Sequence, residues 1–201
     1  MSNERASDDL GDAEREPNPV RERNPWILRV VALCGIAVLA VVMLRPASKA
    51  DSFPIPQFSL DHLSGDGSIS SDEIAGKIAI INFWASWCGP CRREAPLLNQ
   101  IASEYSEEEL VVIGVVVQDT PEEAQAFVRK FGLTYTIADG LDQELYRALR
   151  KSASAQEGLP QTYFVGPDGQ ISLVGDGAPV LGELDEAELR AAIAALGGDA
   201  G

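Results

Sequence analysis

Hydrophobic residues form one long apolar stretch near the N-terminus and shorter periodic runs beyond it. Residues 1–25 are polar and show no apolar period, which predicts a disordered segment. Residues 26–44 form an apolar stretch of 19 residues, enough for about 28 Å of helix against a hydrocarbon core of about 30 Å. We therefore expect a transmembrane signal-anchor helix at 26–44, a linker at 45–54, a folded domain at 55–197 and a disordered tail at 198–201.

The charges that flank the apolar stretch indicate its orientation. Three arginines precede it or lie at its start, whereas one arginine and one lysine follow it. This weak excess favours a cytoplasmic N-terminus and a folded domain on the periplasmic or extracytoplasmic side of the cell membrane. The alternative is a signal peptide cleaved after Ala50, because Ser48-Lys49-Ala50 resembles a cleavage site. A retained anchor is favoured, because signal peptides usually have a shorter apolar core of about 7–15 residues.

Beyond residue 54 the pattern alternates between strand and helix periods. A short apolar run at 78–84 predicts a buried strand. A nearly continuous β-branched run at 110–117 predicts a central strand that is covered on both faces. A helix follows each of them, and Gly132 is placed to end the second helix. The pattern also predicts an edge strand at 53–60, a short strand at 135–138, a helix at 141–149, a hairpin of strands 162–165 and 171–174, and a last helix carrying the apolar residues of 189–196. This succession predicts an α/β domain, with a sheet flanked by helices.

The junction between the first buried strand and its helix carries Cys88 and Cys91, separated by Gly89 and Pro90. Pro90 suits the first helical turn, where its missing N–H costs nothing. Cys88 then lies at the helix start, where unpaired backbone N–H groups and the helix dipole favour a thiolate over a thiol. An exposed thiolate with a second thiol three residues on predicts dithiol–disulfide exchange.

Composition and charge exclude several other kinds of site. The third cysteine, Cys34, lies in the apolar stretch, so the domain offers only two cysteines and His62. A structural zinc site needs about four such ligands. Both methionines precede the domain, which argues against a methionine-lined copper site, and we expect no metal or cofactor. The net charge of −15 comes from the domain, which therefore should repel nucleic acid.

Residues 83–91, FWASWCGPC, resemble the active-site signature of thioredoxin-fold proteins. The stretch from Gly158 through Val165 is similar to the cis-proline loop and following strand of that fold. More narrowly, Asn82 replaces a buried aspartate of thioredoxin, and Glu94 follows the second cysteine by three residues. Both features resemble the membrane-anchored TlpA/ResA/DsbE (CcmG)-like group, which supplies reducing power outside the cytoplasm, often for cytochrome c maturation. The resemblance covers roughly residues 53–197 and implies a thioredoxin-like α/β fold with a central mixed sheet.

Residues around the dithiol are expected to bind the client. Trp87 adjoins the first cysteine and should form part of the contact surface, together with Gly89 and Pro90. The resemblance implies that the peptide bond before Pro160 is cis. The backbone of Leu159 would then pair with an incoming client strand.

Glu94 is the remaining candidate for the chemistry. Its i, i+3 spacing lets the carboxyl lean towards Cys91. Resolution of a mixed disulfide requires Cys91 to lose a proton, which a partly buried carboxyl could accept and return. On the residues alone, an exposed acid that merely suits a helix N-terminus is an equally good interpretation. The resemblance to ResA-type proteins favours the proton-transfer role.

Thiol chemistry predicts the reaction. The Cys88 thiolate attacks a client disulfide, and Cys91 resolves the mixed disulfide and leaves a reduced client. We expect an exported, membrane-tethered reductase that acts on clients such as apocytochrome c or a copper-site assembly protein. A transmembrane electron donor would re-reduce the pair. The Gly-Pro pair and Asn82 favour this direction over a disulfide oxidase of the same fold; the third hypothesis is a redox-responsive binding or sensing domain without turnover.

Overall fold

The computed structural model describes residues 52–172 and 179–197. The segments predicted at 1–25, 26–44 and 198–201, and the possible cleavage site after Ala50, lie outside these residues. Among the described helices, none has both the length and the apolar character needed to cross a membrane.

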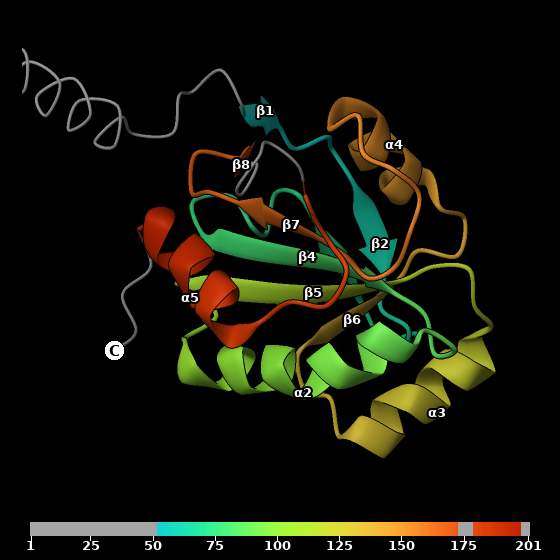
Figure 1. The fold of residues 1–201 in the computed structure, drawn as a ribbon. Helices are drawn as coiled ribbons and strands as arrows, with labels where there is room; N and C mark the ends of the chain where they lie inside the picture. Colours follow the sequence, from blue (N-terminus) through green and yellow to red (C-terminus); the bar gives the residue numbers. More distant parts are fainter. Residues whose placement is uncertain (1–51, 173–178, 198–201) are drawn as a thin grey trace, which may run out of the picture. The chain divides into compact units, whose positions relative to one another are not determined.

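The described residues form a mixed sheet with the strand order β1-β8-β7-β4-β5-β6 (Figure 1). Strands β4, β5 and β6 run parallel to one another, and β6 lies at one edge of the sheet. Strand β7 lies antiparallel to β4 and to β8. A short β9 also pairs with β7. The strands are β1 (Ser52–Pro54), β4 (Ile78–Trp84), β5 (Leu110–Val116), β6 (Thr136–Asp139), β7 (Gln161–Val165), β8 (Gln170–Ser172) and β9 (Val180–Leu181). The expected mixed sheet is therefore confirmed.

Within the described residues, four helices cover the two faces of this sheet: α2 (Gly89–Glu104), α3 (Pro121–Phe131), α4 (Glu144–Ser152) and α5 (Glu186–Ala195). Successive side chains of a strand point to opposite faces. On one face of β4, Ile81 and Phe83 pack in a cluster with α4. On the other face, Ile80 packs in a cluster with α2 and α5, while Trp84 joins a third cluster with α2 and α3. Both faces of β4 are thus buried, which confirms the buried strand predicted at 78–84.

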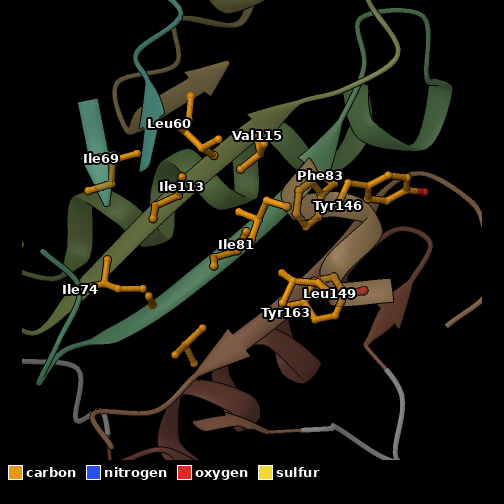
Figure 2. Close-up of a cluster of buried hydrophobic side chains, with 14 of the residues drawn as sticks. Leu60, Ile69, Ile74, Ile81, Phe83, Ile113, Val115, Tyr146, Leu149 and Tyr163 are labelled. Atoms are coloured by element: carbon orange, nitrogen blue, oxygen red, sulfur yellow. The ribbon is translucent and has the colours of Figure 1, made fainter. Parts of the chain in front are cut away.

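The cluster beneath α4 holds large aromatic side chains (Figure 2). The ring of Phe83 lies 5.1 Å from that of Tyr146 and 5.9 Å from that of Tyr163, measured between ring centroids. Burial of such rings removes much apolar surface from water and stabilises the domain. The cluster therefore anchors the strand from which the cysteine loop emerges.

The predicted edge strand at 53–60 is wrong, because the structure divides it into two strands. Strand β1 pairs with β8 at the sheet edge, while β2 (Ser59–Asp61) pairs with β3 (Ser68–Ser70) in a separate two-stranded sheet. Pro54 and Pro56 have no backbone N–H to donate, so a continuous ladder cannot pass through them.

Capping signals located the second predicted helix. Thr120 caps α3, and its side chain accepts a hydrogen bond from the Glu123 N–H at 3.3 Å. Gly132 ends the helix in the left-handed conformation, with φ of 61°. The helix predicted at 141–149 is α4, which begins at Glu144. The Leu141 N–H donates to Asp139 Oδ1, so residue 141 belongs to a turn that precedes the helix.

Candidate active site

Cys88 and Cys91 form a disulfide at the start of α2, with their Cα atoms 5.3 Å apart. Cys88 occupies the N-cap position, and its Sγ accepts a hydrogen bond from the Cys91 N–H at 3.2 Å. Pro90 lies in the first turn, where no donor is lost. The structure thus confirms the predicted helix start and places a backbone N–H against the Cys88 sulfur.

The expectation that Cys88 is exposed is wrong for the disulfide form. Cys88 is 3% exposed and Cys91 is 1% exposed. Both lie in the cluster that also contains Trp84 and Ala85, with Leu159 packed against it. The surrounding surface, rather than the sulfur atoms, is therefore what an approaching protein meets first.

Trp87 projects from this surface, since it is 58% exposed. Its Nε1 donates to the Gln118 carbonyl at 2.8 Å, which fixes the indole against the loop after β5. Two hydrogen bonds from the backbone N–H and hydroxyl of Ser86 to the Asp119 carboxylate hold the preceding residue to the same loop. Sequence analysis missed these supports, because no local pattern links residues more than thirty positions apart.

The loop of residues 158–160 lies beside the cysteines. Its Leu159–Pro160 peptide bond is cis, as the resemblance implied. Leu159 is half-buried, and its backbone forms no hydrogen bond with any residue of the ranges 52–172 and 179–197. Leu181 covers Gly158, where an added Cβ would lie 3.0 Å from its Cδ1. Leu181 is 47% exposed and extends the apolar surface beyond the predicted residues.

Glu94 is buried between α2 and the sheet, with 2% of its surface exposed. Asn82 Nδ2 donates to Oε1 at 2.7 Å, and the Leu184 N–H donates to Oε2 at 3.0 Å. Asn82 also donates to the Thr162 hydroxyl at 2.9 Å. The interpretation of Glu94 as an exposed acid at a helix start is therefore wrong. Its carboxyl is held by Asn82 and Leu184, and no hydrogen bond to Cys91 is formed within the described residues.

This environment changes the acidity of Glu94. Burial raises its pKa from 4.5 to about 7, although the hydrogen bonds from Leu184 and Asn82 lower it. The negative charge of Glu183 raises the pKa further. A carboxyl with a pKa near 7 exists in both protonation states near neutral pH, which suits a group that accepts and returns protons.

The described part of the chain contains no cluster of three or more His, Cys, Asp or Glu side chains that could hold a metal ion. His62, the histidine considered above, has its Nδ1 2.9 Å from the Asp66 carbonyl oxygen. The site therefore consists of a cysteine pair joined as a disulfide, a buried carboxyl and an apolar rim.

Comparison with known proteins agrees with this arrangement. The AhpC/TSA family matches residues 53–174. Thiol-disulfide oxidoreductase ResA of Oceanobacillus iheyensis is 29% identical over 175 residues, which cover 82% of this chain and 88% of that protein. Thiol:disulfide interchange protein DsbE of Pseudomonas fluorescens biotype C is 30% identical over 154 residues, covering 73% of this chain and 82% of that protein.

Among solved structures, MTB dsbF in its mixed oxidized and reduced forms aligns with a TM-score of 0.59 and 29% identity. The alignment covers 70% of this chain and 95% of that chain. The chain therefore belongs to the AhpC/TSA family and is a thiol–disulfide oxidoreductase of the ResA/DsbE type.

Proposed function

We propose that this protein is an exported, membrane-tethered reductase of client disulfides that works through the Cys88/Cys91 dithiol. The observation that carries the proposal is the cysteine pair at the N-cap of α2 beside the buried Glu94 carboxyl. The relatives named ResA and DsbE support the same chemistry.

In the proposed reaction, the reduced enzyme donates two electrons and two protons to a client disulfide. The Cys88 thiolate, favoured by the helix start, attacks one client sulfur, and the released client thiolate takes a proton from solvent. Glu94 accepts the Cys91 proton, and the Cys91 thiolate then attacks the Cys88 sulfur. The enzyme disulfide forms, the client bond to Cys88 breaks, and the second client thiolate leaves to be protonated.

The rim around the disulfide supplies the proposed client contacts. Trp87, Gly89 and Pro90 form its border beside the first cysteine, and Trp87 is presented rigidly by its bond to Gln118. The unpaired Leu159 backbone, next to Pro160, is available to an extended client segment.

We also propose that the protein acts as a reductase outside the cytoplasm in a role of the cytochrome c maturation type. Clients would be apocytochrome c or a copper-site assembly protein, and a transmembrane electron donor would restore the dithiol. The support for export is the apolar stretch 26–44 with its flanking charges. These assignments are tested separately from the chemistry.

The reduction potential of the pair tests the proposed direction. A potential is oxidising when the reduced form is strongly stabilised. Within the described residues, one backbone N–H contacts the Cys88 sulfur, so the stabilisation of a thiolate there by hydrogen bonding is limited. We expect a value nearer the about −270 mV of thioredoxin than the about −120 mV of a strong oxidant. Equilibration with glutathione buffers measures it.

A potential above about −150 mV would make the protein an oxidase instead. Insulin reduction with dithiothreitol provides the control for turnover. A pair with a reducing potential and no insulin reduction would favour a redox-responsive binding domain.

Membrane attachment is tested by extraction of the full-length protein with alkaline carbonate. We expect the protein to stay in the membrane pellet, because a retained helix at 26–44 would bury about 28 Å of apolar length. A chain that begins at Asp51 should be extracted and serves as the control. Recovery of the full-length product as a soluble chain starting at Asp51 would show cleavage.

A further inference from the structure

The Glu94 carboxyl belongs to a buried chain of polar groups that runs from β7 through β4 to α2. Its Oε1 accepts from Asn82 Nδ2 at 2.7 Å, and the same nitrogen donates to the Thr162 hydroxyl at 2.9 Å. Glu94 and Asn82 are each 2% exposed, and Thr162 is fully buried. Because a buried polar group without a partner is costly, each member depends on the next one for its hydrogen bonds.

The sheet register brings Thr162 and Asn82 together. They lie directly opposite each other in the antiparallel pairing of β7 with β4, so both side chains leave the same face of the sheet. Phe164, two residues along β7, packs on that face in the cluster formed with α2 and α5. Tyr163 packs on the opposite face in the cluster with α4. Thr162 and Asn82 therefore face α2, from which Glu94 reaches them.

The Asn82 amide nitrogen carries two hydrogens, and the structure supplies one acceptor for each, the Glu94 carboxyl and the Thr162 hydroxyl. An ionised carboxyl can only accept, so the nitrogen of Asn82, and not its oxygen, must face Glu94. Without the Thr162 hydroxyl, the second hydrogen would lose its buried partner. Rotation of the amide would relieve this loss, but its oxygen would then face Glu94 and pair only with a protonated carboxyl.

Strand β7 also supports the second donor to Glu94. Thr162 lies two residues after Pro160, where the loop proposed to bind the client ends and the strand begins. On its other side, Thr162 pairs with Val180 of β9. The chain continues from β9 into the loop that carries Leu184, whose N–H donates to Glu94 Oε2 at 3.0 Å. Both donors to the carboxyl are thus held from the same point of β7.

We propose that Thr162 is a positioning residue for the reduction of client disulfides, because its hydroxyl holds the Asn82 amide in the orientation that donates to the Glu94 carboxylate. This role rests on the proposed proton-transfer function of Glu94. The proton passes from the Cys91 sulfur to the Glu94 carboxylate, and the Cys91 thiolate then attacks the Cys88 sulfur. Thr162 acts through its neighbours and gains and loses nothing in this step.

Other charged and titratable groups around Glu94 come from three parts of the chain. Cys91 and Arg93 lie on α2, and Arg93 forms an ion pair of 2.6 Å with Glu183 in the loop before α5. The negative charge of Glu183 adds to the burial that raises the pKa of Glu94. Burial and then the charge of Glu94 raise the pKa of Tyr135, in the segment before β6. Strands β4 and β7 contribute neutral contacts, so a substitution on β7 leaves these charges in place.

The first test follows the Glu94 carboxyl by ¹³C NMR from pH 4 to 10 in the full-length disulfide form, held in detergent micelles. Thr162→Val removes the hydroxyl and nearly keeps the shape of the side chain. The variant carboxyl should bind its proton about tenfold more tightly, because the ionised form loses the support of a well-oriented donor. Its titration midpoint should therefore move upward from about 7. An unchanged midpoint overturns the proposal.

Two further variants separate the hydroxyl from the strand. Thr162→Ser keeps the hydroxyl and should titrate as wild type does. Tyr163→Phe removes a hydroxyl from the next residue of β7, which donates to Gln161 Oε1 at 3.0 Å on the opposite face, and should also keep the wild-type midpoint. If Thr162→Ser titrated like Thr162→Val, or if Tyr163→Phe shifted the midpoint as much, the Thr162 hydroxyl would have no specific role.

A measurement on the wild type keeps the test decisive if Thr162→Val does not fold. The ¹⁵N resonance of the Asn82 side-chain amide should titrate with the same midpoint as the Glu94 carboxyl, because the amide donates to it. Both amide hydrogens should exchange slowly with water, since each has a buried acceptor. Rapid exchange of the hydrogen that faces Thr162 would overturn the proposal.

Single-turnover reduction of a disulfide peptide supplies the kinetic readout. At pH 7, Thr162→Val should slow resolution by Cys91 about two- to fivefold, because fewer Glu94 carboxyls are ionised, and should leave the first attack by Cys88 unchanged. The difference should disappear above about pH 9, where the carboxyl is ionised in both proteins. A shifted midpoint with wild-type resolution would count against Glu94 as the proton acceptor, and so against the proposed function. An unchanged midpoint would count against Thr162 alone, since the titration needs no turnover.

Discussion

Cys91→Ser should stop turnover and leave the protein joined to its clients as mixed disulfides. The first attack depends on Cys88, which keeps its N-cap position and the N–H of residue 91. The second attack depends on the sulfur of Cys91, which a hydroxyl cannot replace because the thiolate is the nucleophile. Non-reducing electrophoresis and mass spectrometry of the trapped complexes measure the outcome and identify the clients.

Cys88→Ser is the matched control for this trap. It removes the attacking thiolate, so we expect no turnover and no mixed disulfides. The remaining Cys91 lies within α2, whereas Cys88 is at the N-cap next to the exposed Trp87, so we expect Cys91 not to attack a client. Client complexes trapped by Cys88→Ser and absent from Cys91→Ser would reverse the roles of the two cysteines.

Glu94→Gln should flatten the dependence of stability on pH. The folded-state pKa of Glu94 is about 7, above the 4.5 of an ordinary glutamate, so the folded protein favours the protonated form. The contribution of this group to stability is therefore fully present below about pH 4.5 and is lost as pH rises through about 7. A difference of that size corresponds to a loss of about 3 kcal/mol, which glutamine cannot show because it does not titrate.

Denaturant unfolding at intervals from pH 4.5 to 8 measures this effect. Asn82 and Leu184 both donate to the carboxyl, and a glutamine amide nitrogen cannot accept from either. The variant should therefore be less stable at low pH by about 1–3 kcal/mol, while its slope with pH is smaller. Glu122→Gln, on the exposed first turn of α3, should keep the wild-type slope. If the free energy of unfolding of Glu94→Gln changed with pH as steeply as that of wild type, the Glu94 carboxyl would be ionised in the folded protein over the whole range from pH 4.5 to 8.

The same variant tests the proposed chemistry. General acid–base groups commonly contribute about 10²–10⁴-fold to a rate. Because Cys91 would lose its proton acceptor, we expect Glu94→Gln to slow resolution by at least about tenfold near pH 7 and to shift the pH profile of the rate. Stopped-flow measurement of client reduction from pH 5 to 10 checks this. Overlapping profiles for variant and wild type would limit Glu94 to a structural role.

Local patterns determined much of the fold. The apolar run of 78–84 has the length of a strand and contains three isoleucines, and β4 has those bounds. Thr120 and Gly132 marked the ends of α3, because capping depends on residues within one turn of the helix. The cysteine pair was located for the same reason, since a strand end, Gly-Pro and a helix start are adjacent in the chain.

Only the tertiary structure decided the state of the site. Glu94 is equally suited by spacing to an exposed or a buried position, and its burial depends on Asn82 and on Leu184, ninety residues away. Sequence likewise could not show that Cys88 is covered in the disulfide form, that Gln118 supports Trp87, or that Leu181 extends the rim. Spacing along the chain fixes only neighbours within a turn or a strand, whereas solvation and pKa depend on groups brought together by folding.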